Sequence, residues 1–186
     1  MATKTLLTAE EFDMLEPPDH ESYELDEGEL VVMPKPPPLH NAVSQNLWVR
    51  IYLYLQTRPI GVVLNPDHMY VLAPNIKRSP DVSFVSAERW NRQDLREEIQ
   101  GGPDLAVEVL SPNDSMSATR RKIRQFFAAG TKAAWVIDPE NRDAEVWEAG
   151  EFARVVRENE TLTAPALLPG FEVRLSELLP ALSPQS

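Results

Sequence analysis

The chain has 186 residues, which is enough for one domain with a hydrophobic core and too few for an expectation of two. Hydrophobic residues make up 42% of the chain, an ordinary globular value, and the absence of cysteine excludes disulfides, thiolate metal sites and cysteine nucleophiles. The formal net charge of −11 argues against a protein that coats nucleic acid non-specifically, although it leaves room for an enzyme with a local basic patch around an acidic metal site.

The first residues, "MATKTLLTAEEF", contain no apolar stretch of the secretory type, and no apolar run in the chain approaches the roughly 20 residues of a membrane span. We therefore expect neither a secretory signal nor membrane anchoring. The lack of cysteine fits a reducing compartment, so the expected location is the cytoplasm. We expect residues 1–186 to form a single domain whose ends, 1–7 and 181–186, are flexible.

The first expected elements are a short helix and a hairpin. Thr8 and Glu11 have the spacing of a capping box, which predicts a helix in "TAEEFDMLEP". "YELDEGELVVMP" predicts a hairpin that turns at or near Asp-Glu-Gly. From His40 to Leu55, apolar residues recur at three- and four-residue spacing and predict a longer helix.

The second half alternates strands with a helix. The expected elements in chain order are strand, turn and strand in "GVVLNPDHMYVLAP", a strand in "DVSFVS", a surface helix or loop over 87–102, the clearest strand in "DLAVEVLS", a helix over 115–129 ended by Gly130, a strand in "AAWVIDP", a hairpin in "DAEVWEAGEFARVV" and a short helix near Leu175 to Leu179. Residues 104–137 have the order of a strand–helix–strand crossover. The predicted fold is α/β, a mixed sheet flanked by helices.

Glu108 interrupts an otherwise apolar strand, "DLAVEVLS". Alternation puts Leu105, Val107 and Val109 on one face of this strand and turns Glu108 toward the other. A buried carboxylate costs free energy unless it is compensated. A structural glutamate would be paired with an arginine or capped by backbone groups, whereas a functional one would belong to a polar site.

Asp81 is a second carboxylate in a similar place, because it follows Pro80 at the mouth of the strand "DVSFVS". Two carboxylates at neighbouring strand ends can hold Mg²⁺ through oxygen ligands. A turn-forming aspartate is the alternative for a lone Pro-Asp, and another Pro-Asp, at Asp104, illustrates how little that dipeptide specifies.

Lys122 borders the apolar stripe of the predicted helix 115–129, so its ammonium could reach the carboxylates on the sheet and orient or deprotonate a water. A solvated surface lysine is the alternative. Arg120, Arg121 and Arg124 surround it and form a local basic cluster, where a phosphate backbone would have to pass.

The order Pro-Asp, glutamate in an apolar strand, then lysine resembles the PD-(D/E)XK nuclease superfamily. The similarity is closer to its Uma-type branch of restriction endonucleases, through the segments "YELDEGELVVMP", "SPDVSFVS", "PDLAVEVLSPNDS" and "WVIDPENRDAEVW". The resemblance covers roughly residues 10–180 and implies a restriction-endonuclease-like sheet with added N-terminal and C-terminal hairpins.

The superfamily lysine is expected two residues after the acid, where this chain has Leu110; in the Uma-type branch the lysine lies on the following helix, which matches Lys122. Phe126 stands where tyrosine is common in the branch.

The resemblance implies metal-dependent hydrolysis of phosphodiester bonds, with DNA as the expected substrate and Mg²⁺ or Mn²⁺ as the cofactor. Asp81, Glu108 and the backbone carbonyl of Val109 would hold the metal, and Lys122 would orient the attacking water. Glu29 is implied as a further acid of the site and His40 as an accessory residue. Cleavage of both strands of a duplex would require two sites, so a homodimer is expected.

Two other classes of function fit the same residues. One is a nuclease-derived binding protein that no longer cuts, which the acidic charge and the missing tyrosine favour. The other is a structural or regulatory dimer module in which Glu108 and Lys122 form only a buried salt bridge. The three differ in their need for a metal, and neither the sequence preference nor the choice between DNA and RNA follows from the residues.

Overall fold

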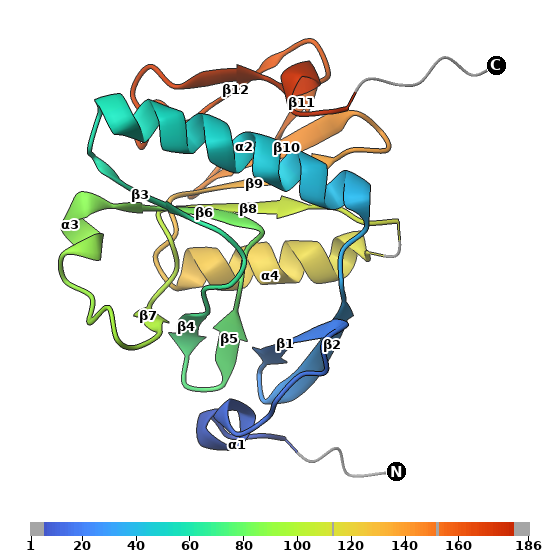
Figure 1. Ribbon diagram of the computed structural model, residues 1–186, viewed down its shortest axis with the longest axis vertical. Coiled ribbons are helices and arrows are strands. Elements are labelled where there is room, and N and C mark those ends of the chain that lie inside the picture. The colour runs from blue at the N-terminus through green and yellow to red at the C-terminus, as the bar shows by residue number, and fades with distance from the viewer. Residues whose placement is uncertain (1–5, 113, 152, 181–186) are drawn as a thin grey trace.

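Within residues 6–112, 114–151 and 153–180, which the computed structural model describes, the chain forms a six-stranded sheet, a five-stranded sheet and a separate hairpin (Figure 1). The helices are α1 (Ala9–Asp13), α2 (Pro38–Thr57), α3 (Ala87–Trp90), α4 (Met116–Ala128) and the 3-10 turn η1 (Leu175–Glu177). The larger sheet contains β3 (Gly61–Leu64), β6 (Val82–Ser86), β8 (Leu105–Val109), β9 (Ala133–Asp138), β10 (Asp143–Glu148) and β11 (Arg154–Arg157). The smaller sheet contains β1 (Glu21–Asp26), β2 (Glu29–Pro34), β4 (Tyr70–Ala73), β5 (Ile76–Arg78) and β7 (Ile99–Gln100), and the hairpin consists of β12 (Thr161–Thr163) and β13 (Glu172–Arg174).

The larger sheet is mixed. Its strand order is β11-β10-β9-β8-β6-β3, and within it β8 and β9 are parallel while the other neighbours are antiparallel. Helix α4 joins the two parallel strands, because parallel neighbours need a crossover connection. The predicted crossover and the predicted mixed α/β fold are confirmed.

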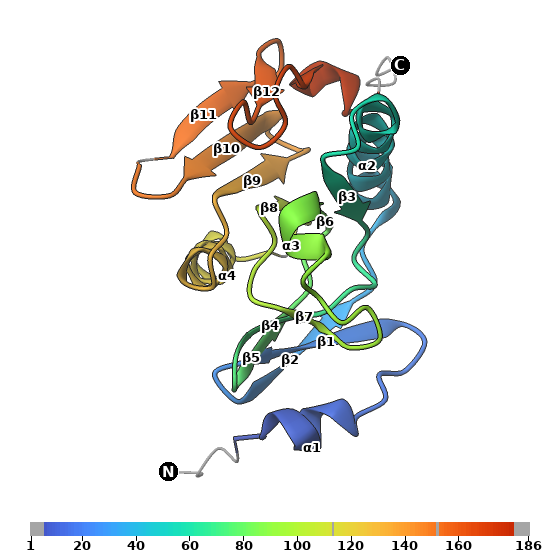
Figure 2. The ribbon, with the colours of Figure 1, turned by 90° about the vertical axis from the view of Figure 1, so that its left-hand side faces the viewer.

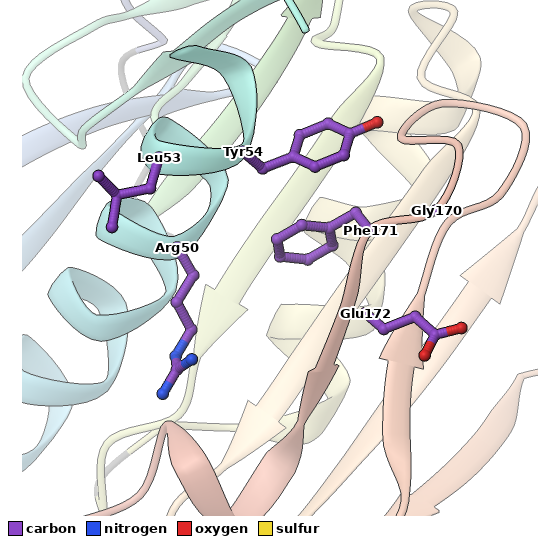
Figure 3. Close-up of a pocket in the computed structure, with 6 residues that line it drawn as sticks. All are labelled: Arg50, Leu53, Tyr54, Gly170, Phe171 and Glu172. Atoms are coloured by element: carbon purple, nitrogen blue, oxygen red, sulfur yellow. The ribbon is translucent and has the colours of Figure 1, made fainter. Parts of the chain in front are cut away.

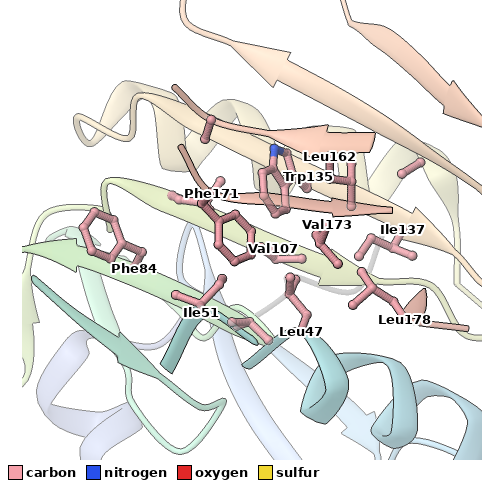
Figure 4. Close-up of a cluster of buried hydrophobic side chains, with 14 of the residues drawn as sticks. Leu47, Ile51, Phe84, Val107, Trp135, Ile137, Leu162, Phe171, Val173 and Leu178 are labelled. Atoms are coloured by element: carbon pink, nitrogen blue, oxygen red, sulfur yellow. The ribbon is translucent and has the colours of Figure 1, made fainter. Parts of the chain in front are cut away.

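Helix α2 packs on one face of the larger sheet. Its residues Val43, Leu47 and Ile51 are fully buried at the predicted helical spacing, and they meet alternate side chains of β8 and β9 (Figure 4). The C-terminal hairpin and the η1 turn that follows it add Leu162, Phe171, Val173 and Leu178 to the same core. Each fully buried side chain of this size contributes roughly 1.5–3 kcal/mol, so this face is the main source of hydrophobic stabilisation.

Helix α4 covers the opposite face (Figure 2). Ile123 and Phe126 are buried against Ala106, Ala134 and Val136, which present small side chains to the helix. The helix ends where predicted, since Gly130 follows it with a φ of 95° that a glycine adopts without strain. Glu108 therefore lies on the α4 face, as the alternation along β8 predicted.

The N-terminal helix and hairpin have the predicted form. Thr8 and Glu11 make the reciprocal bonds of a capping box at the start of α1. In the hairpin β1–β2, the turn residues Glu27 and Gly28 have φ values of 52° and 85°, as a two-residue turn between antiparallel strands requires. This hairpin belongs to the smaller sheet, whose strand order is β2-β1-β5-β4-β7.

Some short elements differ from the prediction. The two strands of "GVVLNPDHMYVLAP" exist as β3 and β4, but they belong to different sheets. Strand β5, which carries Lys77 and Arg78, and the hairpin β12–β13 were not predicted. The C-terminal helix is only the 3-10 turn η1, and 87–102 contains the short α3, a loop and β7.

The predicted flexibility of the ends concerns mainly residues 1–5 and 181–186, which lie outside the described residues. Leu7 is within the described part, and its N–H donates to the carbonyl of Gly28 (2.8 Å). In the described part of the chain, no helix has the length and apolar character needed to cross a membrane.

Asp104, the Pro-Asp aspartate before β8, has a structural role. Its side chain is completely buried and accepts a hydrogen bond from the N–H of Ser86 (2.8 Å), at the start of α3. Its other oxygen lies 2.8 Å from the ammonium of Lys132. Burial alone would raise the pKa of Asp104, but Lys132 and Ser86 together lower it below the ordinary value.

We expect Asp104→Ala to lower the free energy of unfolding by about 1–3 kcal/mol at neutral pH, because the Ser86 N–H loses its acceptor. A carboxyl group whose pKa is lower in the folded state stabilises the protein above its unfolded pKa and loses that contribution as the pH falls through the folded pKa. The difference between wild type and variant in urea unfolding should therefore be constant above about pH 5 and shrink below about pH 4. A difference that persists unchanged in acid would contradict this role of the ionised side chain.

Candidate active site

Asp81 and Glu108 come together because of the register between β6 and β8. These strands are antiparallel and pair Val82 with Val107, so the next residues outward, Asp81 and Glu108, face each other. The N–H of Val109 donates to Asp81 Oδ2 at 2.7 Å. The two acids that the sequence analysis singled out are thus neighbours at one end of this strand pair.

His40 contacts the same oxygen of Asp81 from the first turn of α2. Its Nε2 lies 3.1 Å from Asp81 Oδ2, and its side chain is almost fully buried. Burial alone would lower the pKa of His40, but the Asp81 carboxylate raises it above the ordinary value. Since both contacts fall on Oδ2, no donor from the described residues occupies Oδ1, which is left available to a ligand.

Lys122 is the cation of the site. It reaches from α4 to both oxygens of Glu108, at 2.9 and 3.0 Å. The same ammonium lies 2.8 Å from Glu24 Oε1 and donates to the carbonyl of Ser79 at 2.9 Å. Burial would lower the pKa of Lys122, but the carboxylates of Glu108, Glu24 and Asp81 raise it, so the ammonium stays charged.

The site contains more negative than positive charge. Burial raises the pKa of Glu108 to about 8; Lys122 opposes this shift, and the nearby Asp81 and Glu24 add to it. Three carboxylates, those of Glu108, Glu24 and Asp81, therefore lie around the Lys122 ammonium, and Glu24 also has Arg78 as a partner. Such an excess of buried negative charge favours the binding of a cation.

Glu24 was missed by the sequence analysis. It lies on β1, is 1% exposed, and accepts a hydrogen bond from the N–H of Ser79 (2.9 Å) in addition to its contact with Lys122. Glu29, the acid of the same hairpin that the resemblance implied, stands at the start of β2 opposite Asp26. No pattern within the hairpin marks Glu24, because its burial depends on Arg78 and Lys122 from other parts of the chain.

Arg78 holds Glu24 in place. Its guanidinium lies 3.0 Å from Glu24 Oε2 and 2.9 Å from Asp26 Oδ2, and its Nε donates to Gln125 at 2.9 Å. Gln125, one turn after Lys122 on α4, donates in turn to Asp26 at 2.7 Å. This buried network fixes the hairpin β1–β2 against α4 with Glu24 facing Lys122.

The arginines around Lys122 are partly engaged by acids. Arg120 lies 2.7 Å from Glu145, and Arg121 lies 3.2 and 3.0 Å from Asp26 and Glu27. Arg124 is exposed. The cluster that was expected to meet a phosphate backbone is therefore largely neutralised.

The two departures from the nuclease pattern have simple packing consequences. Leu110 packs beside the α4 core, so the strand position of the superfamily lysine is apolar here. Phe126 is fully buried, and the Lys122 ammonium lies 5.9 Å from its ring centroid. The lysine thus reaches the acids from the helix, over an aromatic ring.

A cleft of about 430 Å³ opens beside Asp81. Its wall consists of Asn41, Ser44, Gln45, Trp48, Val49, Asn65, Pro66, Asp67 and Asp81. A smaller hollow of about 290 Å³ lies elsewhere on α2, against β13, and includes both Arg50 and Glu172 (Figure 3). Only the first of these two is lined by a residue of the candidate site.

The residues fit a hard divalent cation with few protein ligands. The described residues contain no group of three or more histidine, aspartate or glutamate side chains placed to hold a metal. Mg²⁺ commonly uses one or two carboxylates and keeps several waters. Asp81 and Glu108 would be two such carboxylates, and the surplus of negative charge around Lys122 would attract the ion.

The mixed α/β fold of this chain has a solved counterpart. The crystal structure of a putative nuclease of family DUF820 from Anabaena variabilis has the same fold, with a TM-score of 0.81 and 21% identity over 92% of this chain and 97% of that chain. The family model Uma2, described as "Putative restriction endonuclease", matches residues 9–178, and the chain belongs to this family. No curated protein matches the chain.

We expect the charge balance of the site to be visible in stability measurements without metal. Lys122→Met should lower the free energy of unfolding by about 3–5 kcal/mol, because it leaves buried carboxylates without their ammonium. Glu108→Gln should leave stability within about 1 kcal/mol of wild type or raise it, since Lys122 keeps Glu24. Urea unfolding in EDTA measures both.

A loss for Glu108→Gln as large as that for Lys122→Met would contradict this balance. It would instead favour the reading of Glu108 and Lys122 as a purely structural salt bridge.

Proposed function

We propose that this protein is a metal-dependent nuclease that hydrolyses phosphodiester bonds of nucleic acid, with DNA as the expected substrate. The observation that carries the proposal is the position of Asp81, Glu108 and Lys122, two facing carboxylates and a buried ammonium beside an open cleft. Membership in a restriction endonuclease family supports the same class of reaction.

Asp81, Glu108 and the backbone carbonyl of Val109 would hold Mg²⁺ or Mn²⁺. When bound, the ion would polarise a phosphoryl oxygen and lower the pKa of a bound water. His40 and the N–H of Val109 orient Asp81 by occupying Oδ2, so that Oδ1 is presented in a fixed direction.

Lys122 would act as a fixed cation and hydrogen-bond donor. Because the surrounding carboxylates raise its pKa, it remains protonated at neutral pH and is poorly suited to remove a proton from water. Its ammonium is held by Glu24 and the Ser79 carbonyl, and it would orient a water or stabilise charge that develops on the phosphate. Superfamily chemistry of this kind leaves a 5′-phosphate.

We assign the role of the further acid of the site to Glu24, in preference to Glu29. Its contact with Lys122 is direct, and Arg78 and Ser79 fix its orientation. Its function would be to keep the ammonium charged and positioned.

The homodimer expected for cutting both strands of a duplex, and the expected cytoplasmic location, stay predictions. A non-cutting binding protein and a regulatory dimer module are the alternatives against which the nuclease is tested.

Divalent-dependent cleavage is the direct test. Wild-type protein should cut DNA in Mg²⁺ or Mn²⁺ and lose this activity in EDTA. Asp81→Asn and Glu108→Gln should reduce the rate by at least about 100-fold, because each removes a charged oxygen ligand. Glu177→Gln, a change at an exposed acid paired with Arg50, is the matched control and should cut normally. Cleavage that survives both ligand changes, or no cleavage of any DNA or RNA, would overturn the nuclease.

The choice between the two hairpin acids has its own test. Glu24→Gln should slow cleavage by roughly 10-fold or more, because it weakens the support of Lys122, whereas Glu29→Gln should cut at nearly the wild-type rate. Initial rates at saturating Mg²⁺ separate the two variants, with urea unfolding as the check on folding. The reverse order of effects would return the role to Glu29.

A further inference from the structure

The cleft beside Asp81 has one wall from α2 and another from the loop between β3 and β4. The helix contributes Asn41, Ser44, Gln45 and Trp48, whose spacing places them along one face. His40, which contacts Asp81, directly precedes this face. The cleft is therefore continuous with the candidate active site.

Trp48 gives this wall a flat and rigid surface. Its ring stacks on that of Tyr52, with centroids 5.0 Å apart and planes inclined by 9°. It also packs against the core beneath α2, so the indole is held on more than one side. The indole Nε1 is buried, and no acceptor from the described part of the chain contacts it.

The charge of the cleft disfavours a phosphate. Its lining contains the carboxylates of Asp67 and Asp81 and the amides of Asn41, Gln45 and Asn65, without a lysine or arginine among the residues that line it. Asp67 is exposed, and its Oδ2 is held at 2.7 Å by the amide of Asn65. Carboxylates accept hydrogen bonds, so with Asp81 assigned to the metal, Asp67 is the lining carboxylate that would accept from an N–H donor of a bound molecule.

The combination of an aromatic wall and hydrogen-bonding side chains is that of a site for a single planar base. Nucleobases outside a duplex stack on aromatic side chains and expose their Watson–Crick edges. Cytosine, adenine and guanine each carry an exocyclic amino group that donates, whereas thymine has none and presents the O4 acceptor where cytosine has N4. A cleft of about 430 Å³ has the size of a small-molecule site and does not admit a double helix.

We propose that this cleft binds an unpaired nucleobase with an exocyclic amino group, next to the phosphate that is cut. The proposal rests on the proposed nuclease function and names single-stranded nucleic acid as its substrate, in place of the duplex from which the homodimer was expected. Stacking would supply the affinity that the acidic surface does not obtain from phosphate contacts. Asp67 would supply the preference for amino-bearing bases.

The test measures binding separately from cleavage. The full chain with Glu108→Gln, which should not cut, is titrated in Mg²⁺ with fluorescent oligo(dC), oligo(dT) and an abasic strand of equal length, and with a duplex. Oligo(dC) should bind about 10-fold more tightly than the abasic strand, as expected for stacking. It should also bind more tightly than oligo(dT) and the duplex.

Trp48→Leu keeps an apolar contact with the core and should reduce the affinity for oligo(dC) to that for the abasic strand. Asp67→Asn, on an exposed loop, should reduce the preference for oligo(dC) over oligo(dT) even if the tryptophan variant folds poorly. Leu53→Gln, a change at an exposed apolar residue of α2 outside the cleft, is the control and should bind as the parent does.

The outcomes separate this proposal from the nuclease itself. Equal binding of the abasic strand and oligo(dC), or unchanged binding by both Trp48→Leu and Asp67→Asn, would overturn the base site while leaving cleavage to its own assay. Base-dependent binding that requires Trp48, in a wild-type protein that cuts nothing, would support the base site and overturn the nuclease.

Discussion

One ammonium group, that of Lys122, lies among carboxylates from three separate parts of the chain. The Lys122 side chain is 12% exposed, and its charge is compensated by Glu24 and Glu108, whose side chains are 2% and 11% exposed. The carboxylates in turn exceed the positive charge available to them. The cluster of carboxylates therefore depends on Lys122 for its stability, and its remaining negative charge favours the binding of a further cation.

The fold brings these groups together through its connections. The antiparallel register of β6 and β8 sets Asp81 opposite Glu108, and the crossover between the parallel strands β8 and β9 brings α4 back over the same face. Helix α2 covers the other face and delivers His40 to Asp81 from its first turn. The large apolar cores on both faces make these positions rigid, which a site needs in order to hold charged groups at fixed distances.

The sequence predicted the elements whose patterns are local. Alternation along β8 is enough to put Glu108 on the face opposite Val107, and helical spacing is enough to place Lys122 beside the buried stripe. The residues that were missed depend on distant contacts. Strand β5 is three residues long and carries two charges, so its pairing partners rather than its composition make it a strand. Glu24 is buried because Arg78 and Lys122 neutralise it, and no pattern within the hairpin distinguishes it from Glu29.

The pairing of Arg78 with Glu24, Asp26 and Gln125 attaches the hairpin β1–β2 to α4. The same contacts complete the surroundings of Lys122, so seating the hairpin and assembling the site are one cooperative event. A molecule in which the hairpin has lifted away would keep its main core but expose a mismatched cluster of charges. Detachment of the hairpin and disruption of the charged cluster around Lys122 are thus the same local unfolding transition. A ligand that binds the intact cluster must therefore also stabilise the smaller sheet.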